Sequence, residues 1–249
     1  MKVFNNIFKL ITFPIYYLVH NNYFFGFIQK FIIGNFKYKK FQFKINNLEL
    51  PLGYYSSFLW NTYELNDRVM IEKNLNKSNK CIIIGGGIGF IAVIAYWKTK
   101  NKIFVFEINP NIINLLKNNL KINKVKFTVY SKNLTITSKI KNKKYNTSNN
   151  FLANSLYRKT NKKINFKNLF YRQIRDFNKF NTLIIDGEGI EDYFIKNIKK
   201  INNIHHLFFE FHNDIFSEEK KNQLFNILKI NKFYLKDKFI NTYYFCKND

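Results

Sequence analysis

Cysteine, histidine and proline are scarce in this sequence, which narrows the classes of protein that it can encode. The two cysteines, Cys81 and Cys246, lie far apart and form no C-x-x-C pair, so neither a zinc ribbon nor a disulfide framework is indicated. Four histidines argue against a histidine-built metal centre. With three prolines and 46% hydrophobic residues, the composition is globular rather than disordered. We expect a cytoplasmic protein without a metal cofactor.

Acidic residues and arginine are also few. The chain has 16 Asp and Glu against 41 Lys and Arg, which gives a formal net charge of +25, yet only four of the basic residues are Arg. A surface selected to bind nucleic acid should use more Arg, because its planar guanidinium binds phosphate and guanine through two hydrogen bonds. Lys, Asn, Ile and Phe can all be encoded by codons of A and T alone, so genome composition accounts for the basicity. The composition therefore argues against nucleic acid as a partner.

A long apolar run is missing as well. Within the first 35 residues, the uncharged stretch 10–19 is too short to span a bilayer, and no signal-peptide cleavage site follows it. Aromatic patches flanked by lysines suit a segment that lies at the inner face of a membrane, but they suit equally a pair of helices packed on a catalytic domain. We expect residues 1–60 to form this aromatic extension with a small hairpin, turning at Asn46-Asn47, and residues 61–249 to form the main domain.

Glycine is rare but concentrated. Of nine glycines, four lie at Gly85, Gly86, Gly87 and Gly89, directly after the apolar run 81–84. A short apolar run is typical of a buried parallel strand, and the residues that follow, 90–97, have the composition of a buried helix. Glycines between a strand and a helix allow a tight turn in which backbone N–H groups approach a ligand. The stretch therefore predicts a nucleotide-cofactor site.

The rest of the chain repeats the strand and helix alternation. Repeated units that end in a strand pair predict an α/β fold, a doubly wound and mostly parallel seven-stranded sheet with a reversed edge strand. Residues 131–181 interrupt this pattern as a variable insertion rich in Lys, Asn, Ser and Thr, which we expect to be mobile over 138–150. The expected strands are 103–107, 125–130, 182–186, 206–211, 233–235 and 242–246, and the expected helices are 62–75, 110–120, 190–201 and 217–228.

The glycine spacing alone leaves the cofactor open. Gly85-x-Gly87-x-Gly89 matches the turn of S-adenosylmethionine-dependent methyltransferases, but counting from Gly87 also satisfies a dinucleotide fingerprint. Glu107, at the end of the second strand, can accept hydrogen bonds from the ribose hydroxyls of either cofactor. The reversed terminal strand pair, the lack of a second nucleotide-binding half and the D-G-E-G-I-E run at 186–191 favour S-adenosylmethionine.

The sequence resembles the FkbM family of methyltransferases over about residues 62–211. The resemblance rests on this run, on I-G-F at 88–90, on F-E-I-N-P at 106–110, and on the asparagines Asn119 and Asn123. The sequence departs from the family at Ile83, where an acidic residue is common, and at Gly187, where an aliphatic residue is usual. The resemblance implies a class I methyltransferase fold and S-adenosylmethionine as cofactor. The cofactor-binding residues that we expect are Gly85, Gly86, Gly87, Gly89, Glu107, Ile108, Asn133 and Asp186.

Methyl transfer to oxygen requires a hydroxyl aligned with the sulfonium methyl and a group that removes its proton. Doubly wound sheets hold their ligands at the carboxyl ends of the strands. The titratable groups expected there are Asp186, Glu188, Glu210 and His212. We expect Asp186 and Glu188 to orient the ligands and His212 or Asp186 to take the proton, while Glu191 is expected to be a solvated helix charge.

The sequence thus predicts an O-methyltransferase that acts on a hydroxyl of a sugar, glycan or related metabolite. Three alternatives remain at this point. They are an RNA methyltransferase that uses the basic surface, a nicotinamide-dependent reductase, and a membrane-associated scaffold with a decayed site.

Overall fold

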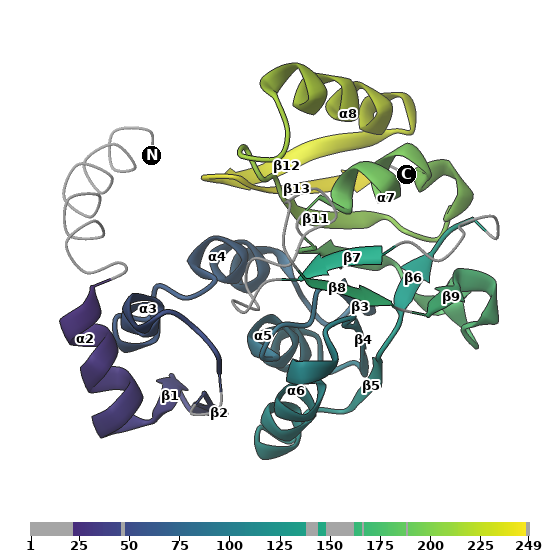
Figure 1. Ribbon diagram of the computed structural model, residues 1–249. Coiled ribbons are helices and arrows are strands. Elements are labelled where there is room, and N and C mark those ends of the chain that lie inside the picture. Colours follow the sequence, from purple (N-terminus) through teal and green to yellow (C-terminus); the bar gives the residue numbers. More distant parts are fainter. Residues whose placement is uncertain are drawn as a thin grey trace. The chain divides into compact units, whose positions relative to one another are not determined.

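Figure 1 shows a computed structural model of the chain, which describes residues 22–45, 48–137, 144–147, 162–165, 167–187 and 189–247. The chain divides into two units, Met1–Leu65 and Asn66–Asp249. The boundary falls close to the expected division between residues 60 and 61. None of the helices in these described ranges has the length and apolar character needed to cross a membrane.

The smaller unit is organised around aromatic side chains. Phe36 and Phe43 lie opposite each other on two antiparallel strands, with their ring centroids 5.5 Å apart, and Phe58 packs 5.3 Å from Phe36. All three side chains are buried, so these three aromatic residues form a core within this unit. The elements are α2 (Tyr23–Phe27), the π-helix η1 (Ile28–Ile33), β1 (Asn35–Tyr38), β2 (Phe41–Lys44), η2 (Leu52–Tyr55) and α3 (Ser56–Leu59).

The hairpin of this unit differs from the expected one. We expected 41–45 to pair with 48–50 through a turn at Asn46-Asn47, residues that lie outside the described ranges. Instead β2 pairs with the preceding strand, and the chain turns at Lys39, whose φ is 52°. The stacked pair of Phe36 and Phe43 stabilises this register through cross-strand packing.

The larger unit contains a seven-stranded sheet in the order β12-β13-β11-β10-β3-β4-β5. Strands β11, β10, β3, β4 and β5 run parallel to one another, whereas β13 is antiparallel to both of its neighbours. This confirms the expected sheet with a reversed strand near its edge. The strands are β3 (Cys81–Ile84), β4 (Ile103–Phe106), β5 (Phe127–Tyr130), β10 (Thr182–Ile185), β11 (His206–Glu210), β12 (Phe233–Phe239) and β13 (Thr242–Lys247).

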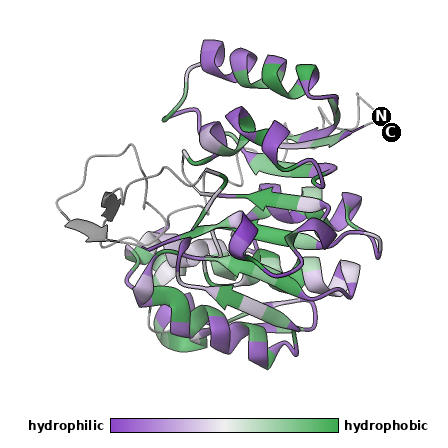
Figure 2. Cartoon of the chain, turned by 90° about the vertical axis from the view of Figure 1, so that its right-hand side faces the viewer, coloured by the Kyte–Doolittle hydropathy of each residue, from purple (hydrophilic) through white to green (hydrophobic). Residues whose placement is uncertain are grey.

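The central strands are buried on both faces, which explains why they lack the alternation of a half-exposed strand. Every residue of β3 and β10 is buried, and Figure 2 shows the strands as largely hydrophobic. The helices carry hydrophilic and hydrophobic residues side by side, as expected of elements with one face on a core and one in water. They are α4 (Leu65–Asn74), α5 (Phe90–Thr99), α6 (Pro110–Ile122), α7 (Glu191–Lys196) and α8 (Glu218–Ile230), with the 3-10 turn η6 (Ile198–Lys200) after α7.

The strand order reverses its direction between β3 and β10. From β3 the chain proceeds to β4 and β5 on one side, and it then crosses to β10 and β11 on the other. The carboxyl ends of β3 and β10 are neighbours, because Ile84 pairs with Ile185. In open α/β sheets ligands bind at such a reversal, outside the carboxyl ends of the strands.

The insertion between β5 and β10 contains short strands. β6 (Asn133–Thr135) is parallel to β9 (Asn168–Phe170), and β7 (Lys144–Thr147) is antiparallel to β8 (Lys162–Asn165). Most of the part that we expected to be mobile, 138–150, lies outside the described residues.

Candidate functional site

The glycine turn follows β3 as expected, and its backbone explains its composition. Gly85, Gly87 and Gly89 have φ values of 86°, 48° and 90°, in the left-handed region that other residues rarely adopt. Gly86 is needed for a different reason, since a Cβ there would lie 2.6 Å from Val105 Cγ1. Each of the four glycines therefore meets a specific steric requirement of the turn.

Glu107 holds this turn closed. Its Oε2 accepts hydrogen bonds from the backbone N–H groups of Gly86 and Gly87, each at 3.0 Å, and its Oε1 accepts one from Asn109 N at 2.8 Å. The side chain is buried, and burial raises the pKa of its carboxyl, while the backbone hydrogen bonds oppose that rise. The expected contact of Glu107 with a ribose stays a prediction, but the residue clearly shapes the cofactor turn.

Asn119 fixes the same turn from its other side. It is fully buried in α6, and its Nδ2 donates to the carbonyl oxygen of Ile88 at 2.9 Å, while Asn123 Nδ2 donates to the carbonyl oxygen of Asn119 at 2.8 Å. These asparagines, which carried part of the family resemblance, thus connect the glycine turn to the second helix.

Two further expected cofactor contacts lie after the neighbouring strands. Ile108 is partly buried beside Glu107, and Asn133 opens β6, where its Nδ2 donates to Asn168 Oδ1 at 3.1 Å. Ile83, in contrast, has no polar role. It is buried within β3 between Ile184 and Val105 on the adjacent strands. The contacts of Ile108 and Asn133 with a cofactor stay predictions.

The second motif, 186–191, adjoins the first. Asp186 follows β10, and its backbone N–H donates to the carbonyl oxygen of Ile84 at 2.9 Å. A Cβ on Gly85 would collide with the backbone carbonyl of Asp186. Gly187 also has a reason to lack a side chain, since a Cβ there would collide with Cγ2 of Ile190. Glu188, which we expected to orient the ligands, lies outside the described residues.

Glu191 differs from our expectation of a solvated helix charge. Its side chain is fully buried, and it accepts hydrogen bonds from the backbone N–H groups of Gly187 at 3.3 Å and Gly189 at 2.8 Å. Its Oε1 also lies 3.6 Å from Nδ1 of His212. Glu191 thus stabilises the turn of the second motif and positions the histidine.

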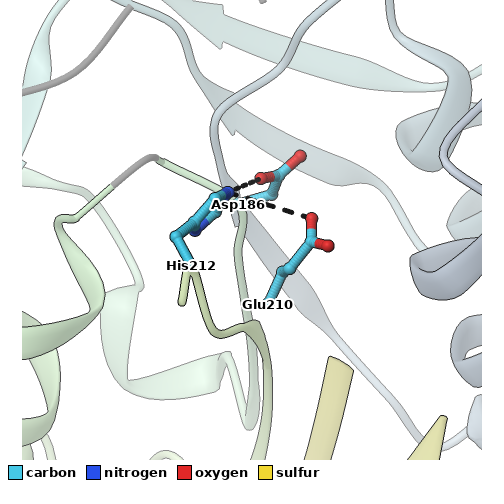
Figure 3. A group of neighbouring side chains, drawn as sticks. All are labelled: Asp186, Glu210 and His212. Carbon is cyan, nitrogen blue, oxygen red and sulfur yellow. Dashed lines mark ion pairs between the residues drawn. The ribbon is translucent and has the colours of Figure 1, made fainter. Parts of the chain in front are cut away.

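His212, Asp186 and Glu210 converge at the ends of β10 and β11 (Figure 3). Nε2 of His212 lies 3.9 Å from Asp186 Oδ1 and 3.9 Å from Glu210 Oε2. The imidazole is 11% exposed, and the two carboxylates are 29% and 22% exposed, so a ligand can reach them. Sequence reasoning placed all three residues at this edge of the sheet, and the structure brings them together.

Electrostatics determine the protonation of His212. Burial lowers its pKa, but the carboxylate of Glu191 beside Nδ1, together with the charges of Asp186 and Glu210, outweighs burial and raises the pKa to about 10. The resting imidazole therefore carries a proton at neutral pH. Of the two groups that we expected to take the proton, His212 and Asp186, this leaves Asp186 as the better proton acceptor.

Glu210 is oriented by two amides that sequence reasoning missed. Its Oε1 accepts hydrogen bonds from Nδ2 of Asn66 at 3.5 Å and Nδ2 of Asn241 at 3.3 Å, and its Oε2 faces His212. Asn66 belongs to α4 and Asn241 to the turn between β12 and β13. No local sequence signal marks either residue, because their contact with Glu210 depends on the folded sheet.

Comparison with known proteins gives one match to a family model. Residues 54–164, less than half of the chain, match the TRM5/TYW2 methyltransferase domain. No curated protein matches the sequence. The chain is similar in structure to ribosomal protein L11 methylase from Lactobacillus delbrueckii subsp. bulgaricus, with 11% identity, a TM-score of 0.46 and coverage of 76% of this chain and 79% of the other.

Two further similar structures are TYW2 proteins. That of P. horikoshii in complex with MeSAdo is 12% identical, with a TM-score of 0.47 and coverage of 85% of this chain and 68% of the other. That of M. jannaschii in complex with AdoMet is 13% identical, with a TM-score of 0.46 and coverage of 85% and 82%.

The strand order, the glycine turn and the family match agree on a class I methyltransferase fold. The expected S-adenosylmethionine-dependent methyltransferase is therefore confirmed at this level. The matching family is not FkbM, so the FkbM resemblance gains no support from the comparison. The acceptor and the atom that is methylated belong to the proposal below.

Proposed function

We propose that the chain transfers the methyl group of S-adenosylmethionine to a hydroxyl oxygen of a sugar, glycan or related polyhydroxylated metabolite. The observation that carries this proposal is the cluster of Asp186, Glu210 and His212 beside the glycine turn. Its carboxylates are acceptors for hydroxyl hydrogens, and they lie at the strand ends where this fold binds ligands.

The cluster fits the requirements of methyl transfer to oxygen. The acceptor oxygen attacks the sulfonium methyl carbon in line with its bond to sulfur, so an O–C bond forms as the C–S bond breaks, and S-adenosylhomocysteine leaves. Asp186 receives the hydroxyl proton, since His212 already carries one in the resting state. Glu210, with its Oε1 held by two amides, orients the acceptor by accepting a second hydrogen bond.

The charge of the cluster favours a neutral acceptor. Asp186, Glu191 and Glu210 place three carboxylates around one imidazole. A phosphodiester backbone at this point would meet like charges, which cost free energy at close range. An RNA acceptor is the second candidate because the chain has a net charge of +25, which attracts polyanions at longer range.

A transfer assay with a labelled methyl group tests the proposal. Wild-type protein is incubated with labelled S-adenosylmethionine and, separately, with a panel of sugars and glycans and with RNA. Asp186→Asn is expected to lower the rate at least about a hundredfold, as is usual for loss of a positioned acid or base. Glu218→Gln is the matched control, because this carboxylate is exposed on α8 and pairs only with Lys221 among the described residues.

Three outcomes contradict the proposal. Calorimetry that shows binding of NADH and none of S-adenosylmethionine would exclude the methyltransferase. Transfer to RNA alone, with binding that weakens steeply as salt rises, would establish the second candidate. Full activity of Asp186→Asn, Glu188→Gln and His212→Ala alike would exclude a role for the cluster in catalysis.

A further inference from the structure

The cluster at the ends of β10 and β11 has the composition of a metal site as well as of a base. Asp186, Glu210 and His212 each offer one ligand atom, and these three atoms lie within 4.8 Å of one another. A cation that binds here displaces the proton from Nε2 of His212, and one nitrogen and two carboxylate oxygens on one side of it leave its other positions open for water or substrate. All three side chains are partly buried, so they are accessible without being freely solvated.

The surroundings orient each ligand toward a common point. Nε2 of His212 faces the two carboxylates, while its Nδ1 faces the buried Glu191 at 3.6 Å. Histidines that ligate metals almost always direct their other ring nitrogen to a carboxylate or a carbonyl oxygen. The amides of Asn66 and Asn241 hold Oε1 of Glu210, which leaves Oε2 directed toward the histidine. These outer contacts resemble those that support metal ligands in general.

The distances are consistent with a cation between the ligands. Nε2 of His212 is 3.9 Å from both carboxylate oxygens, which is longer than a hydrogen bond. Two ligands bound at about 2.0–2.2 Å to one ion lie roughly 3–4 Å apart, so the observed spacing fits with small side-chain adjustments.

We propose that Asp186, Glu210 and His212 bind a divalent cation that coordinates the acceptor hydroxyl. The mixed nitrogen and oxygen ligands favour a first-row ion such as Mn²⁺ over Ca²⁺. The cation lowers the pKa of the coordinated hydroxyl, the proton leaves to a carboxylate of the cluster, and the oxygen attacks the sulfonium methyl with S-adenosylhomocysteine as the leaving group. The catalytic purpose rests on the proposed function, but metal binding can be measured without it.

Titration with Mn²⁺ alone, followed by the electron paramagnetic resonance signal of the free ion, tests the site in the full chain. We expect one bound ion per chain. Asp186→Asn, Glu210→Gln and His212→Gln should each weaken binding at least tenfold, and Asn241→Ala should weaken it by about tenfold through the orientation of Glu210. Glu218→Gln should bind as the wild type does, and circular dichroism should show that each variant is folded.

The outcomes separate the metal site from the proposed function. Lack of Mn²⁺ binding, or equal binding by all three ligand variants, overturns the metal site. Methyl transfer to a hydroxyl that persists in the presence of a chelator overturns the catalytic role of the cation, but leaves the proposed function standing. If the chain binds one Mn²⁺ ion but transfers a methyl group to no acceptor, the metal site is retained and the proposed function fails.

A second, independent observation concerns the smaller unit. Along α2 and η1 the side chains of Tyr23, Phe24, Phe27 and Phe31 recur at helical spacing, and all four are exposed, Tyr23 by 70% and Phe24 by 67%. Ile32 beside them is 70% exposed. A row of large apolar side chains in water marks an interaction surface.

The charge around this row indicates the partner. The first 48 residues contain seven lysines and no acidic residue. Lys30 lies in η1 itself, with its Nζ 5.3 Å from the ring centroid of Phe31. Aromatic side chains on one face of a helix with lysines beside them fit the headgroup region of an anionic bilayer. We infer that α2 and η1 form a surface that binds anionic membranes.

Vesicle flotation of the full chain tests this inference. Binding is expected to vesicles that contain phosphatidylserine, weaker binding to phosphatidylcholine alone, and a further decrease at high salt. The double variant Phe24→Glu/Ile32→Glu should reduce binding at least tenfold, whereas Ile230→Glu, at an apolar position of α8 that is 81% exposed, should not. Equal flotation of the double variant and the wild type, or none by either, overturns the inference.

Discussion

Gly85 is the residue at which the glycine turn meets the second motif, and its replacement by alanine gives a sharp test of the structure. Two costs add. The φ of 86° is left-handed, which costs an L-residue about 1–2 kcal/mol. The added Cβ also collides with the backbone carbonyl of Asp186, and backbone in the centre of a sheet cannot rotate away as a side chain can. Together these place Gly85→Ala among the exceptional substitutions that cost more than about 4 kcal/mol.

Gly187→Ala is the matched comparison. Its φ is not left-handed, and the obstacle is Cγ2 of the Ile190 side chain. Overpacking of this kind costs about 1–3 kcal/mol. Because the obstacle is a side chain, the cost of Gly187→Ala should disappear in a background of Ile190→Ala, which a double-mutant cycle measures as coupling. No side-chain replacement should rescue Gly85→Ala.

Urea unfolding followed by circular dichroism gives the free energies, and a thermal scan provides a check. A loss of 4 kcal/mol in a domain of this size lowers the melting temperature by roughly 8–16 °C. Gly85→Ala should also abolish binding of S-adenosylmethionine in calorimetry, since the turn cannot close. A Gly85→Ala protein that unfolds within about 1 kcal/mol of the wild type would show that the two motifs are not in contact, and the reasoning would fail.

Three further predictions concern single side chains. Asn119→Ala leaves the carbonyl oxygen of Ile88 without its amide donor and should cost about 1–3 kcal/mol in urea unfolding. Burial raises the pKa of the Cys81 thiol to about 12, so a thiol reagent should label only Cys246 in the native protein and both cysteines in urea. Burial acts to raise the pKa of Asp237, but hydrogen bonds from side chains of α4 outweigh it and hold the pKa below its ordinary value. This carboxylate therefore contributes stability that is present above its unfolded pKa and is lost as pH falls through the folded one, and Asp237→Asn should flatten that acid-side loss in urea unfolding.

The sheet could be predicted from the sequence because its central strands carry their own signal. Ile82 and Ile83 in β3, and Ile184 and Ile185 in β10, belong to short apolar runs that are buried on both faces. Such runs admit few alternatives in a chain of alternating strands and helices. The reversed strand near the edge could also be predicted, because the last two expected strands, 233–235 and 242–246, are too close together in the sequence for a parallel crossover between them.

Strand pairing could not be predicted from turn preference alone. The expected turn at Asn46-Asn47 lies outside the described residues, and the observed hairpin turns earlier, at Lys39, where Phe36 and Phe43 stack across β1 and β2. Burial of the two aromatic rings stabilises this pairing. An aromatic-rich segment should therefore be assigned its strand register from the pairs that it can bury.

Some residues of the candidate site could be predicted from the sequence, and others could not. Asp186, Glu210 and His212 could be placed from the sequence because each follows a predicted strand, and parallel strands end at one edge. Glu191 could not, since an acidic residue in the first turn of a helix is usually solvated. Its burial depends on the N–H groups of a glycine turn before it and on His212 beyond the next strand.

The hydrogen bonds of the glycine turn also bear on the choice between the two cofactors that the spacing allowed. A dinucleotide places its pyrophosphate on the free N–H groups of such a turn. Here the N–H groups of Gly86 and Gly87 donate to the carboxylate of Glu107, and that of Gly89 donates to the carbonyl oxygen of Gly86. A pyrophosphate would have to displace a buried carboxylate and then lie beside it. S-adenosylmethionine carries no phosphate, so it does not need these N–H groups to be free, and the closed turn is compatible with the methyl donor but not with the dinucleotide.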